Sequence, residues 1–337
     1  MASTLASTAA PVQVPALSAP ILEVKDLRIQ FRVDAGTVAA VNDVSFALAP
    51  GETVGIVGES GSGKSQILLA SMGLLAKNGK ASGSVKLRGQ EILGLRENAL
   101  DSFRGAAMSM IFQDPMTSLN PFLRVQTQLT EVLVKHRGMG EAEATRHAID
   151  MLEQVSIPDA KKRIRQYPHE FSGGMRQRVM ISMALLCQPS ILFADEPTTA
   201  LDVTVQAQIL DLIKDLTARM GTTVVLVTHD LGVVASICDR VIVLYGGRVM
   251  ESGPAEQIFS DPRHPYTKGL LQSMPRLDEK THGILHTIPG QPPSLALPTP
   301  GCPFEPRCEF RRPHCATVRP EIQAAEGRSL ACHEAHL

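Results

Sequence analysis

The sequence predicts an α/β fold with a doubly wound, largely parallel β-sheet. Continuous apolar runs at residues 191–194 and 223–227 have the length of strands that are buried on both faces. Segments with helical spacing, residues 203–216 and 231–237, follow these runs, so strands and helices alternate along the chain. A glycine-rich loop at residues 58–65 joins another apolar run to a helix-compatible segment, which is the context of a phosphate-binding loop.

This loop fits the pattern G-x-x-x-x-G-K-[ST]. Its glycines allow successive backbone N–H groups to converge on phosphate oxygens, and the following helix N-terminus adds a partial positive charge. We expect Lys64 to reach the β- and γ-phosphates of a nucleotide and the Ser65 hydroxyl to bind Mg²⁺. The alternative, a glycine-rich turn without a ligand, is disfavoured because a strand and a helix flank the loop. The predicted nucleotide contacts in the loop are Gly58, Ser60, Gly61, Ser62, Gly63, Lys64 and Ser65.

Composition narrows the possible partners of this 337-residue chain. The 33 basic and 34 acidic residues nearly cancel, so we expect no nucleic-acid partner. The sequence has no run of about 18 apolar residues, so we expect any membrane role to come through a partner. Six cysteines at uneven spacing, without the basic and apolar regions of a signal peptide, favour reduced thiols or a metal site over a disulfide framework.

Changes in composition predict the domain organisation. Residues 1–20, rich in alanine, serine, threonine and proline, predict a disordered tail. Residues 21–260 predict the nucleotide-binding domain, which starts with an antiparallel β layer and continues with the parallel core sheet. Within it, helical spacing predicts a helical subdomain at about residues 120–172. Residues 261–337 contain many prolines and predict a separate, irregular module.

Two carboxylates, Asp195 and Glu196, follow the apolar run at residues 191–194. Ligands of open α/β sheets bind outside the carboxyl ends of the strands, so we expect both side chains beside the nucleotide. Asp195 can bind the metal ion, and Glu196 can polarise a water molecule for attack on the γ-phosphate. Such a pair is weak evidence alone, but it becomes strong downstream of a phosphate-binding loop.

The motifs together resemble those of the ATPase subunits of ABC transporters. The resemblance spans residues 21–253 and implies an ABC-type nucleotide-binding domain, a P-loop NTPase that binds ATP and Mg²⁺. The matching elements occur in the order and approximate spacing of that family: the phosphate loop, Gln113, Ser172-Gly173-Gly174, Asp195-Glu196, Leu201-Asp202 and His229.

The resemblance implies the catalytic roles. Gln113 would contact Mg²⁺ and the attacking water and sense the membrane partner, while Asp195 would be a magnesium ligand. His229 alone is more often a core histidine, but among these motifs it resembles the switch histidine that stabilises transition-state charge. The implied catalytic residues are Lys64, Gln113, Glu196 and His229.

Ser172, Gly173 and Gly174 resemble the signature motif, which closes over the γ-phosphate of ATP held by the opposite subunit. Asp202 lies in the segment that resembles the D-loop. A Ser-Gly-Gly at a helix start is a second anion site, and one domain with a separate helical insert cannot fold both anion sites onto one nucleotide. Two subunits arranged head-to-tail solve this problem, so we expect a dimer.

The sequence departs from the family pattern at two places. Phe171 and Met175 flank the Ser-Gly-Gly, where many family members have leucine and glutamine. The resemblance to the peptide-uptake branch nevertheless implies an active site. Phe31 is the best candidate for an adenine-stacking aromatic residue, although a core phenylalanine in a strand fits equally well.

Cysteines cluster in the proline-rich C-terminal region. Such a segment has too little apolar material to fold unaided, which suggests a metal site of thiolates that suits zinc or an iron–sulfur cluster. Cys187 and Cys238 lie outside this region and fit small buried residues. The candidate ligands, spaced C-x₅-C-x₆-C-x₁₆-C, are Cys302, Cys308, Cys315 and Cys332.

The same region resembles the C-terminal extension of oligopeptide/dipeptide transporter ATPases. By this resemblance we favour a [4Fe–4S] cluster, with zinc or free thiols as alternatives. The segments that carry the resemblance are His264-Pro265-Tyr266-Thr267, Cys302-Pro303-Phe304 and Pro306-Arg307-Cys308.

The resemblance implies the ATP-hydrolysing subunit of a peptide-type ABC importer, peripheral on the cytoplasmic face of a bacterial inner membrane. Its expected partners are two transmembrane permease subunits, a second homologous ATPase subunit and an extracytoplasmic solute-binding protein. Three alternatives remain: an importer of the same architecture for nickel, glutathione or another small solute, a soluble ABC ATPase, and an ATP-binding regulatory protein without turnover.

Overall fold

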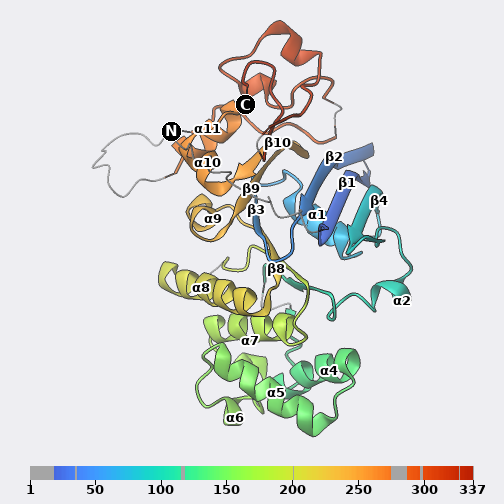
Figure 1. Cartoon of the computed structure of the whole chain (residues 1–337), viewed down its shortest axis with the longest axis vertical. Helices are drawn as coiled ribbons and strands as arrows, with labels where there is room; N and C mark the ends of the chain where they lie inside the picture. Colours follow the sequence, from blue (N-terminus) through green and yellow to red (C-terminus); the bar gives the residue numbers. More distant parts are fainter. Residues whose placement is uncertain are drawn as a thin grey trace, which may run out of the picture.

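The chain forms two β-sheets, with a group of helices at one end and the C-terminal segment at the other (Figure 1). The computed structural model describes residues 19–34, 36–114, 118–199, 201–274, 287–296, 299–325 and 327–336. Most of the predicted disordered tail therefore lies outside the described residues. Among the described residues, no helix combines the length and the apolar character that a membrane span requires.

The larger sheet, within the described part of the chain, has eight strands in the order β11-β12-β10-β9-β3-β8-β7-β6. Its members from β9 to β6 pair in parallel, as the alternating sequence pattern predicts, while β10, β12 and β11 pair antiparallel. The strands are β3 (Thr53–Val57), β6 (Met108–Ile111), β7 (Ile191–Asp195), β8 (Thr223–Val227), β9 (Arg240–Tyr245), β10 (Arg248–Pro254), β11 (Gln323–Ala325) and β12 (Arg328–Leu330).

Helices cover this sheet and build the helical end of the molecule. The segment predicted to be a helical subdomain contains α4 to α6 and a short 3₁₀ helix, and α7 packs beside them (Figure 1). The helices are α1 (Lys64–Ser71), α2 (Glu97–Leu100), α4 (Val125–Arg137), α5 (Glu141–Gln154), α6 (Ala160–Arg163), η1 (Pro168–Glu170), α7 (Gly173–Leu185), α8 (Val203–Met220), α9 (Leu231–Ile237), α10 (Ala255–Ser260) and α11 (Pro265–Gln272), with 3₁₀ helices η2 (Glu305–Arg307) and η3 (Pro313–Ala316).

The central strands separate two apolar cores. In β7, Ile191 and Phe193 face the core that contains α1 and the antiparallel sheet, whereas Leu192 and Ala194 face the core that contains α7 and α8. All four side chains are buried. A strand with apolar partners on both faces needs a continuous apolar sequence, and the apolar run at residues 191–194 therefore predicted this strand correctly.

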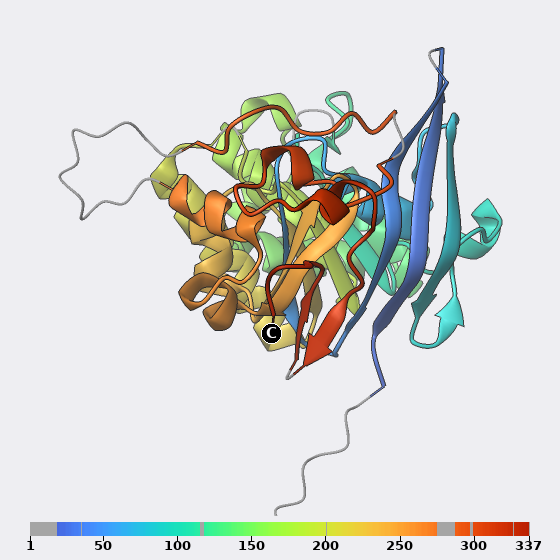
Figure 2. The same cartoon turned by 90° about the horizontal axis from the view of Figure 1, so that it is seen from above.

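The smaller sheet, among the described residues, has the order β2-β1-β4-β5 and lies along one side of the molecule (Figure 2), where β1 and β2 contact α1. Phe31 of this sheet is paired with Val38 on one side and with Gly79 on the other. Its ring is partly buried and packs over Gly79, so the structure gives Phe31 a packing role, and adenine stacking stays a prediction. The strands are β1 (Leu22–Val33), β2 (Gly36–Leu48), β4 (Gly79–Leu87) and β5 (Gln90–Glu91).

The C-terminal segment is less separate and less irregular than its prolines predict. β12 pairs with β10, with Leu330 opposite Glu251, and so extends the larger sheet. α11 begins at Pro265. Proline is favourable at the first position of a helix, because the N–H that it lacks would have no partner within the helix. His264 caps this helix, since its Nδ1 accepts a hydrogen bond of 3.0 Å from the Tyr266 N–H.

Three aromatic side chains join this segment to the core sheet. Tyr245 of β9 lies against Tyr266 of α11 at 4.5 Å between ring centroids and meets Phe304 edge-on at 5.3 Å. All three rings are buried. Buried aromatic pairs add directional attraction to the hydrophobic gain, so this cluster holds the C-terminal segment on the sheet.

We expect Phe304→Ala to lower the free energy of unfolding by about 3–5 kcal/mol, because it removes a buried ring and leaves a cavity. Phe310→Ala, which truncates an exposed ring of the same segment, is expected to change it by less than about 0.5 kcal/mol. Tyrosine fluorescence during urea unfolding measures both, since the chain has no tryptophan and two of its three tyrosines lie in this cluster. Equal effects of the two substitutions would contradict the role of the cluster.

Candidate functional site

The phosphate-binding loop lies between β3 and α1, as predicted, and its backbone is closely surrounded. Gly63, which precedes α1, has φ +97°, and a Cβ there would lie 2.3 Å from the Ala40 carbonyl oxygen. At Gly58 a Cβ would lie 2.1 Å from the Leu244 carbonyl oxygen. Only glycine fits at both positions, so the two glycines allow the loop to adopt this conformation against the neighbouring backbone.

Two buried polar groups of the loop are suited to a phosphate. Lys64 Nζ donates hydrogen bonds to the carbonyl oxygens of Gly58 at 2.8 Å and Glu59 at 2.9 Å. Burial lowers the pKa of Lys64, and nearby carboxylates partly oppose that shift. The buried Ser62 hydroxyl has no hydrogen-bond partner within the described residues. A buried hydroxyl without a partner is costly, so an anionic ligand in the loop would satisfy it.

Two of the three predicted magnesium contacts, Ser65 and Asp195, lie side by side. Ser65 Oγ, in the first turn of α1, donates a 2.8 Å hydrogen bond to Asp195 Oδ1 at the end of β7. Burial raises the pKa of Asp195, and the charge of neighbouring Glu196 acts in the same direction. A divalent cation at this hydroxyl and carboxylate would favour the ionised form, so the pair fits Mg²⁺.

Glu196 is the centre of a hydrogen-bonded group. Its Oε2 accepts from Gln113 Nε2 at 3.1 Å and from Thr199 Oγ1 at 2.9 Å. His229 Nδ1 lies 3.5 Å from the same oxygen, although the histidine side chain is 70% exposed. Glu196 also has φ 45°, a conformation that side-chain-bearing residues rarely adopt. Strained residues cluster at functional sites, and the side chain of this one is held by the hydrogen bonds from Gln113 and Thr199.

The residues of the predicted signature motif and D-loop lie at helix starts. Ser172 Oγ accepts from the Met175 N–H at 3.4 Å at the start of α7, and Asp202 Oδ1 accepts from the Val205 N–H at 3.0 Å at the start of α8. Ser172, Gly173 and Asp202 are exposed. No hydrogen bond or ion pair among the described residues joins them to the phosphate loop of the same chain. Their N–H groups therefore remain available to a group from outside.

The four C-terminal cysteines converge on one pocket, which His264 also lines. Burial raises the pKa of the Cys302 thiol to about 12, and the negative charge of the other three thiolates adds to this shift. A bound cation would favour the thiolate form of such a buried thiol, because it compensates the negative charge. Sulfur is the donor that a thiophilic metal prefers, but no three of these four cysteines bring their Sγ atoms within 4.8 Å of one another, so the predicted ligands share a pocket without forming a closed metal site.

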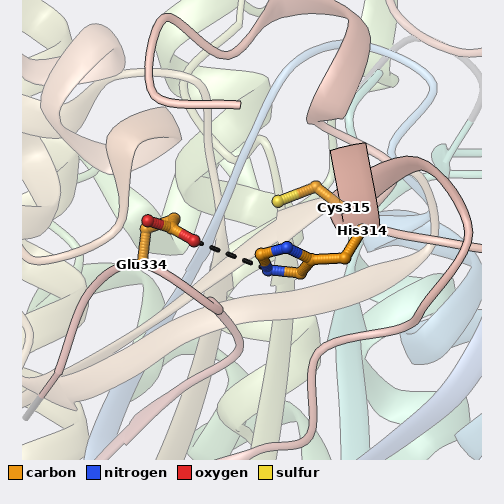
Figure 3. Close-up of side chains that lie close together, drawn as sticks. All are labelled: His314, Cys315 and Glu334. Atoms are coloured by element: carbon orange, nitrogen blue, oxygen red, sulfur yellow. Dashed lines mark ion pairs between the residues drawn. The ribbon is translucent and has the colours of Figure 1, made fainter. Parts of the chain in front are cut away.

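His314, Cys315 and Glu334 form a second grouping beside this pocket (Figure 3). Their candidate ligand atoms all lie within 4.8 Å of one another, which holds for no other such group in the described part of the chain. His314 Nε2 lies 3.5 Å from Glu334 Oε1. Cys315 belongs to both groupings, so one metal ion at either of them would use this thiol and exclude it from the other.

Comparison with known proteins places the chain in a family. The family described as "ABC transporter" matches residues 41–199, and that described as "Oligopeptide/dipeptide transporter, C-terminal region" matches residues 250–315. The oligopeptide transport ATP-binding protein OppD of Salmonella typhimurium is 55% identical over 320 residues, 95% of either chain. The chain belongs to the oligopeptide/dipeptide ABC transporter ATP-binding subunits.

Further relatives of this ABC transporter subunit agree with that assignment. OppD of Escherichia coli is 55% identical over 93% of this chain and 92% of its own. The solved structure of a dimeric ATP-binding cassette, MJ0796 bound to ADP and Pi, is 30% identical and superposes with a TM-score of 0.63 over 69% of this chain and 98% of that chain. The ABC ATPase fold predicted from the motifs is thus confirmed.

The structure brings together most of the residues that the motifs single out, but it also shows one that the motifs missed. Lys64, Ser65, Gln113, Glu196 and His229 lie around the carboxyl ends of β3, β7 and β8, and their catalytic roles stay predictions. The residue that the motifs missed is Thr199, which donates a hydrogen bond to Glu196. The only sign of it in the sequence was its position, three residues after Glu196.

We expect Thr199→Val to reduce the kcat of ATP hydrolysis about tenfold, because it removes one hydrogen bond that orients a charged carboxylate, roughly 1.4 kcal/mol. The apparent Kd for ATP is expected to stay within about twofold, since Thr199 bonds to Glu196 and not to the phosphate loop. The matched control is Thr204→Val on the exposed face of α8. An unchanged kcat in Thr199→Val would show that Gln113 alone is sufficient to orient Glu196.

Proposed function

We propose that the chain hydrolyses ATP to drive the import of oligopeptides by an ABC transporter. The observation that carries the proposal is the intact group around Glu196, in a chain that is 55% identical to OppD proteins over most of its length. The OppD name concerns oligopeptides, and the match at residues 250–315 concerns the oligopeptide/dipeptide type, which supports peptide as the cargo.

The geometry suggests how hydrolysis proceeds. Lys64 and the loop N–H groups bind the phosphates. Ser65 and Asp195 would hold Mg²⁺, which would supply positive charge to offset the negative charge of the phosphates. Glu196, oriented by Gln113 and Thr199, accepts a proton from the attacking water.

His229 and the segment Ser172-Gly173-Gly174 complete the proposed site. His229, at the exposed edge of the site, stabilises charge that develops in the transition state. The exposed Ser172 and Gly173, with the half-buried Gly174, bind the γ-phosphate of ATP held by the second ATPase subunit from the start of α7, and Asp202 faces that subunit. ATP thereby joins the two subunits, and its hydrolysis releases them.

The proposal implies a membrane complex. Two permease subunits, a second homologous ATPase and an extracytoplasmic solute-binding protein are the partners, and the chain is peripheral at the cytoplasmic face of a bacterial inner membrane. The cargo meets the binding protein and the permease, not this chain. Nickel, glutathione or another small solute therefore remains the alternative cargo, and a soluble ABC ATPase the alternative class.

We expect Glu196→Gln to lower ATP turnover of the purified complex by about 100-fold or more while ATP stays bound, because the amide cannot accept the proton. The matched control is Glu153→Gln on the exposed face of α5, which should keep the wild-type rate. The complex is purified through a tag on this chain, and the subunits that co-purify are identified. A chain that purifies alone and soluble contradicts the transporter assignment and leaves only the nucleotide site.

For the C-terminal extension, residues 261–337, we propose that Cys302, Cys308, Cys315 and Cys332 hold a [4Fe–4S] cluster. The support is the pocket that the four cysteines share, together with their sulfur donors, which suit an iron–sulfur cluster. Such a cluster supplies a rigid cross-link between loops and one-electron redox chemistry. Zinc is the alternative, and the close approach of His314, Cys315 and Glu334 favours it, since zinc accepts nitrogen, sulfur and oxygen ligands.

We expect the anaerobically purified protein to contain about four iron and four sulfide per chain, and Cys308→Ser to lose most of both. Metal and acid-labile sulfide analysis measures this, with Cys187→Ser, a cysteine outside the extension, as the control. About one zinc without sulfide would support the zinc alternative. The absence of both metals would contradict a metal site.

A further inference from the structure

Glu59, the second residue of the phosphate loop, is bound by a residue from the far end of the chain. Arg307 Nη1 lies 2.7 Å from Glu59 Oε2, and Nη2 lies 3.0 Å from Oε1. The contact is bidentate, and the arginine side chain is only 6% exposed. Paired parallel N–H···O bonds fix both partners in direction as well as distance.

Further contacts fix Arg307 itself. Its Nε donates to the Pro289 carbonyl oxygen at 2.9 Å and its Nη2 to the Ile288 carbonyl oxygen at 3.1 Å. Nη1 also donates to the Tyr245 hydroxyl at 3.1 Å, and the guanidinium carbon lies 5.7 Å from the Tyr245 ring centroid. The pKa of Arg307 is raised, chiefly by the hydrogen bond with Glu59. A guanidinium held by so many partners behaves as a fixed part of the protein.

The backbone of Glu59 is held from the same side. Its N–H donates a 2.9 Å hydrogen bond to the Tyr266 hydroxyl, which reaches the loop from α11. Tyr266 is fully buried in the aromatic cluster with Tyr245 and Phe304. The C-terminal segment thus binds both the side chain and the main chain of one loop residue.

The other side of Glu59 contacts the phosphate-binding lysine. The Glu59 carbonyl oxygen accepts the 2.9 Å hydrogen bond from Lys64 Nζ. Lys64 Nζ also donates a 2.8 Å hydrogen bond to the Gly58 carbonyl oxygen, which belongs to the same peptide group as the Glu59 N–H held by Tyr266. Arg307 fixes the Glu59 side chain, which lies between this peptide group and the one whose carbonyl also binds Lys64.

We propose that Arg307 and Tyr266 are positioning residues for ATP binding: they hold Glu59 so that the phosphate loop and Lys64 keep the form that binds MgATP. The inference rests on the proposed function, and it assigns part of the nucleotide site to the C-terminal extension. Neither residue is among the predicted nucleotide contacts. Both act through Glu59, so their loss affects binding before it affects the chemical step.

A purely structural role makes a different prediction. If the Arg307–Glu59 pair only docks the extension onto the ATPase core, its loss lowers stability but leaves the affinity of the folded protein for nucleotide unchanged. If the pair positions the loop, Glu59→Gln and Arg307→Ala both weaken binding, and the two effects do not add because both remove the same contact.

The experiment measures the Kd of the full-length wild type and its variants for a fluorescent N-methylanthraniloyl-ATP with Mg²⁺, at a temperature where thermal unfolding shows every variant folded. We expect Arg307→Ala and Glu59→Gln each to raise the Kd about 10- to 100-fold, and the double variant to be no weaker than the weaker single one. Tyr266→Phe, which removes only the hydroxyl, should raise it several-fold. At saturating ATP, the kcat of the complex should fall by less than about threefold.

Arg311→Ala is the matched control, because this exposed arginine of the same segment pairs with Glu305 and not with the loop. Its Kd should equal that of the wild type. An unchanged or tightened Kd in Arg307→Ala and Glu59→Gln, or effects of the two that multiply, would overturn the inference while leaving the proposed function intact. A wild type that binds no nucleotide would instead refute the proposed function.

Discussion

The parallel pairing of β3, β8 and β7 sets the position of the groups in the nucleotide site. β8 lies between the other two strands, with Val54 opposite Val225 and Phe193 opposite Val225 on the other side. The carboxyl ends of all three strands therefore reach one edge of the sheet, where β3 delivers the phosphate loop and β7 delivers its carboxylates. The 2.8 Å bond between Ser65 and Asp195, 130 residues apart, is a direct consequence of this register.

The features that the sequence predicted well depend on residues that are close together in the chain. The phosphate loop and the Asp195-Glu196 pair are recognised from a few neighbouring residues, because the chemistry of each needs a fixed local order of strand, turn and helix. A strand buried on both faces needs an unbroken apolar run, and β7 and β8 show one. The meeting of these segments in one sheet then followed from the alternation of strands and helices.

What the sequence did not predict depends on pairing between distant segments. β12 has only three residues, too few for a periodic pattern, and it forms because the edge of β10 offers it hydrogen-bond partners. The partner of Arg307 lies 248 residues away, and one arginine in a polar, proline-rich stretch looks like many exposed arginines. Likewise, the packing of Phe31 over Gly79 is fixed by the register of β4 and not by the sequence near Phe31.

Stability alone does not explain why a charged pair lies between the phosphate loop and the C-terminal segment. Bringing Arg307 and Glu59 out of water offsets most of their attraction, and a well-packed apolar pair is often as stable. An apolar pair, however, has no preferred rotation about its contact, whereas a bidentate guanidinium–carboxylate pair has one. The aromatic cluster of Tyr245, Tyr266 and Phe304 already holds the segment on the sheet. The charged pair therefore contributes more to the orientation of Glu59 than to the free energy of unfolding. Direction is what a loop needs when its peptide groups must point at phosphate oxygens.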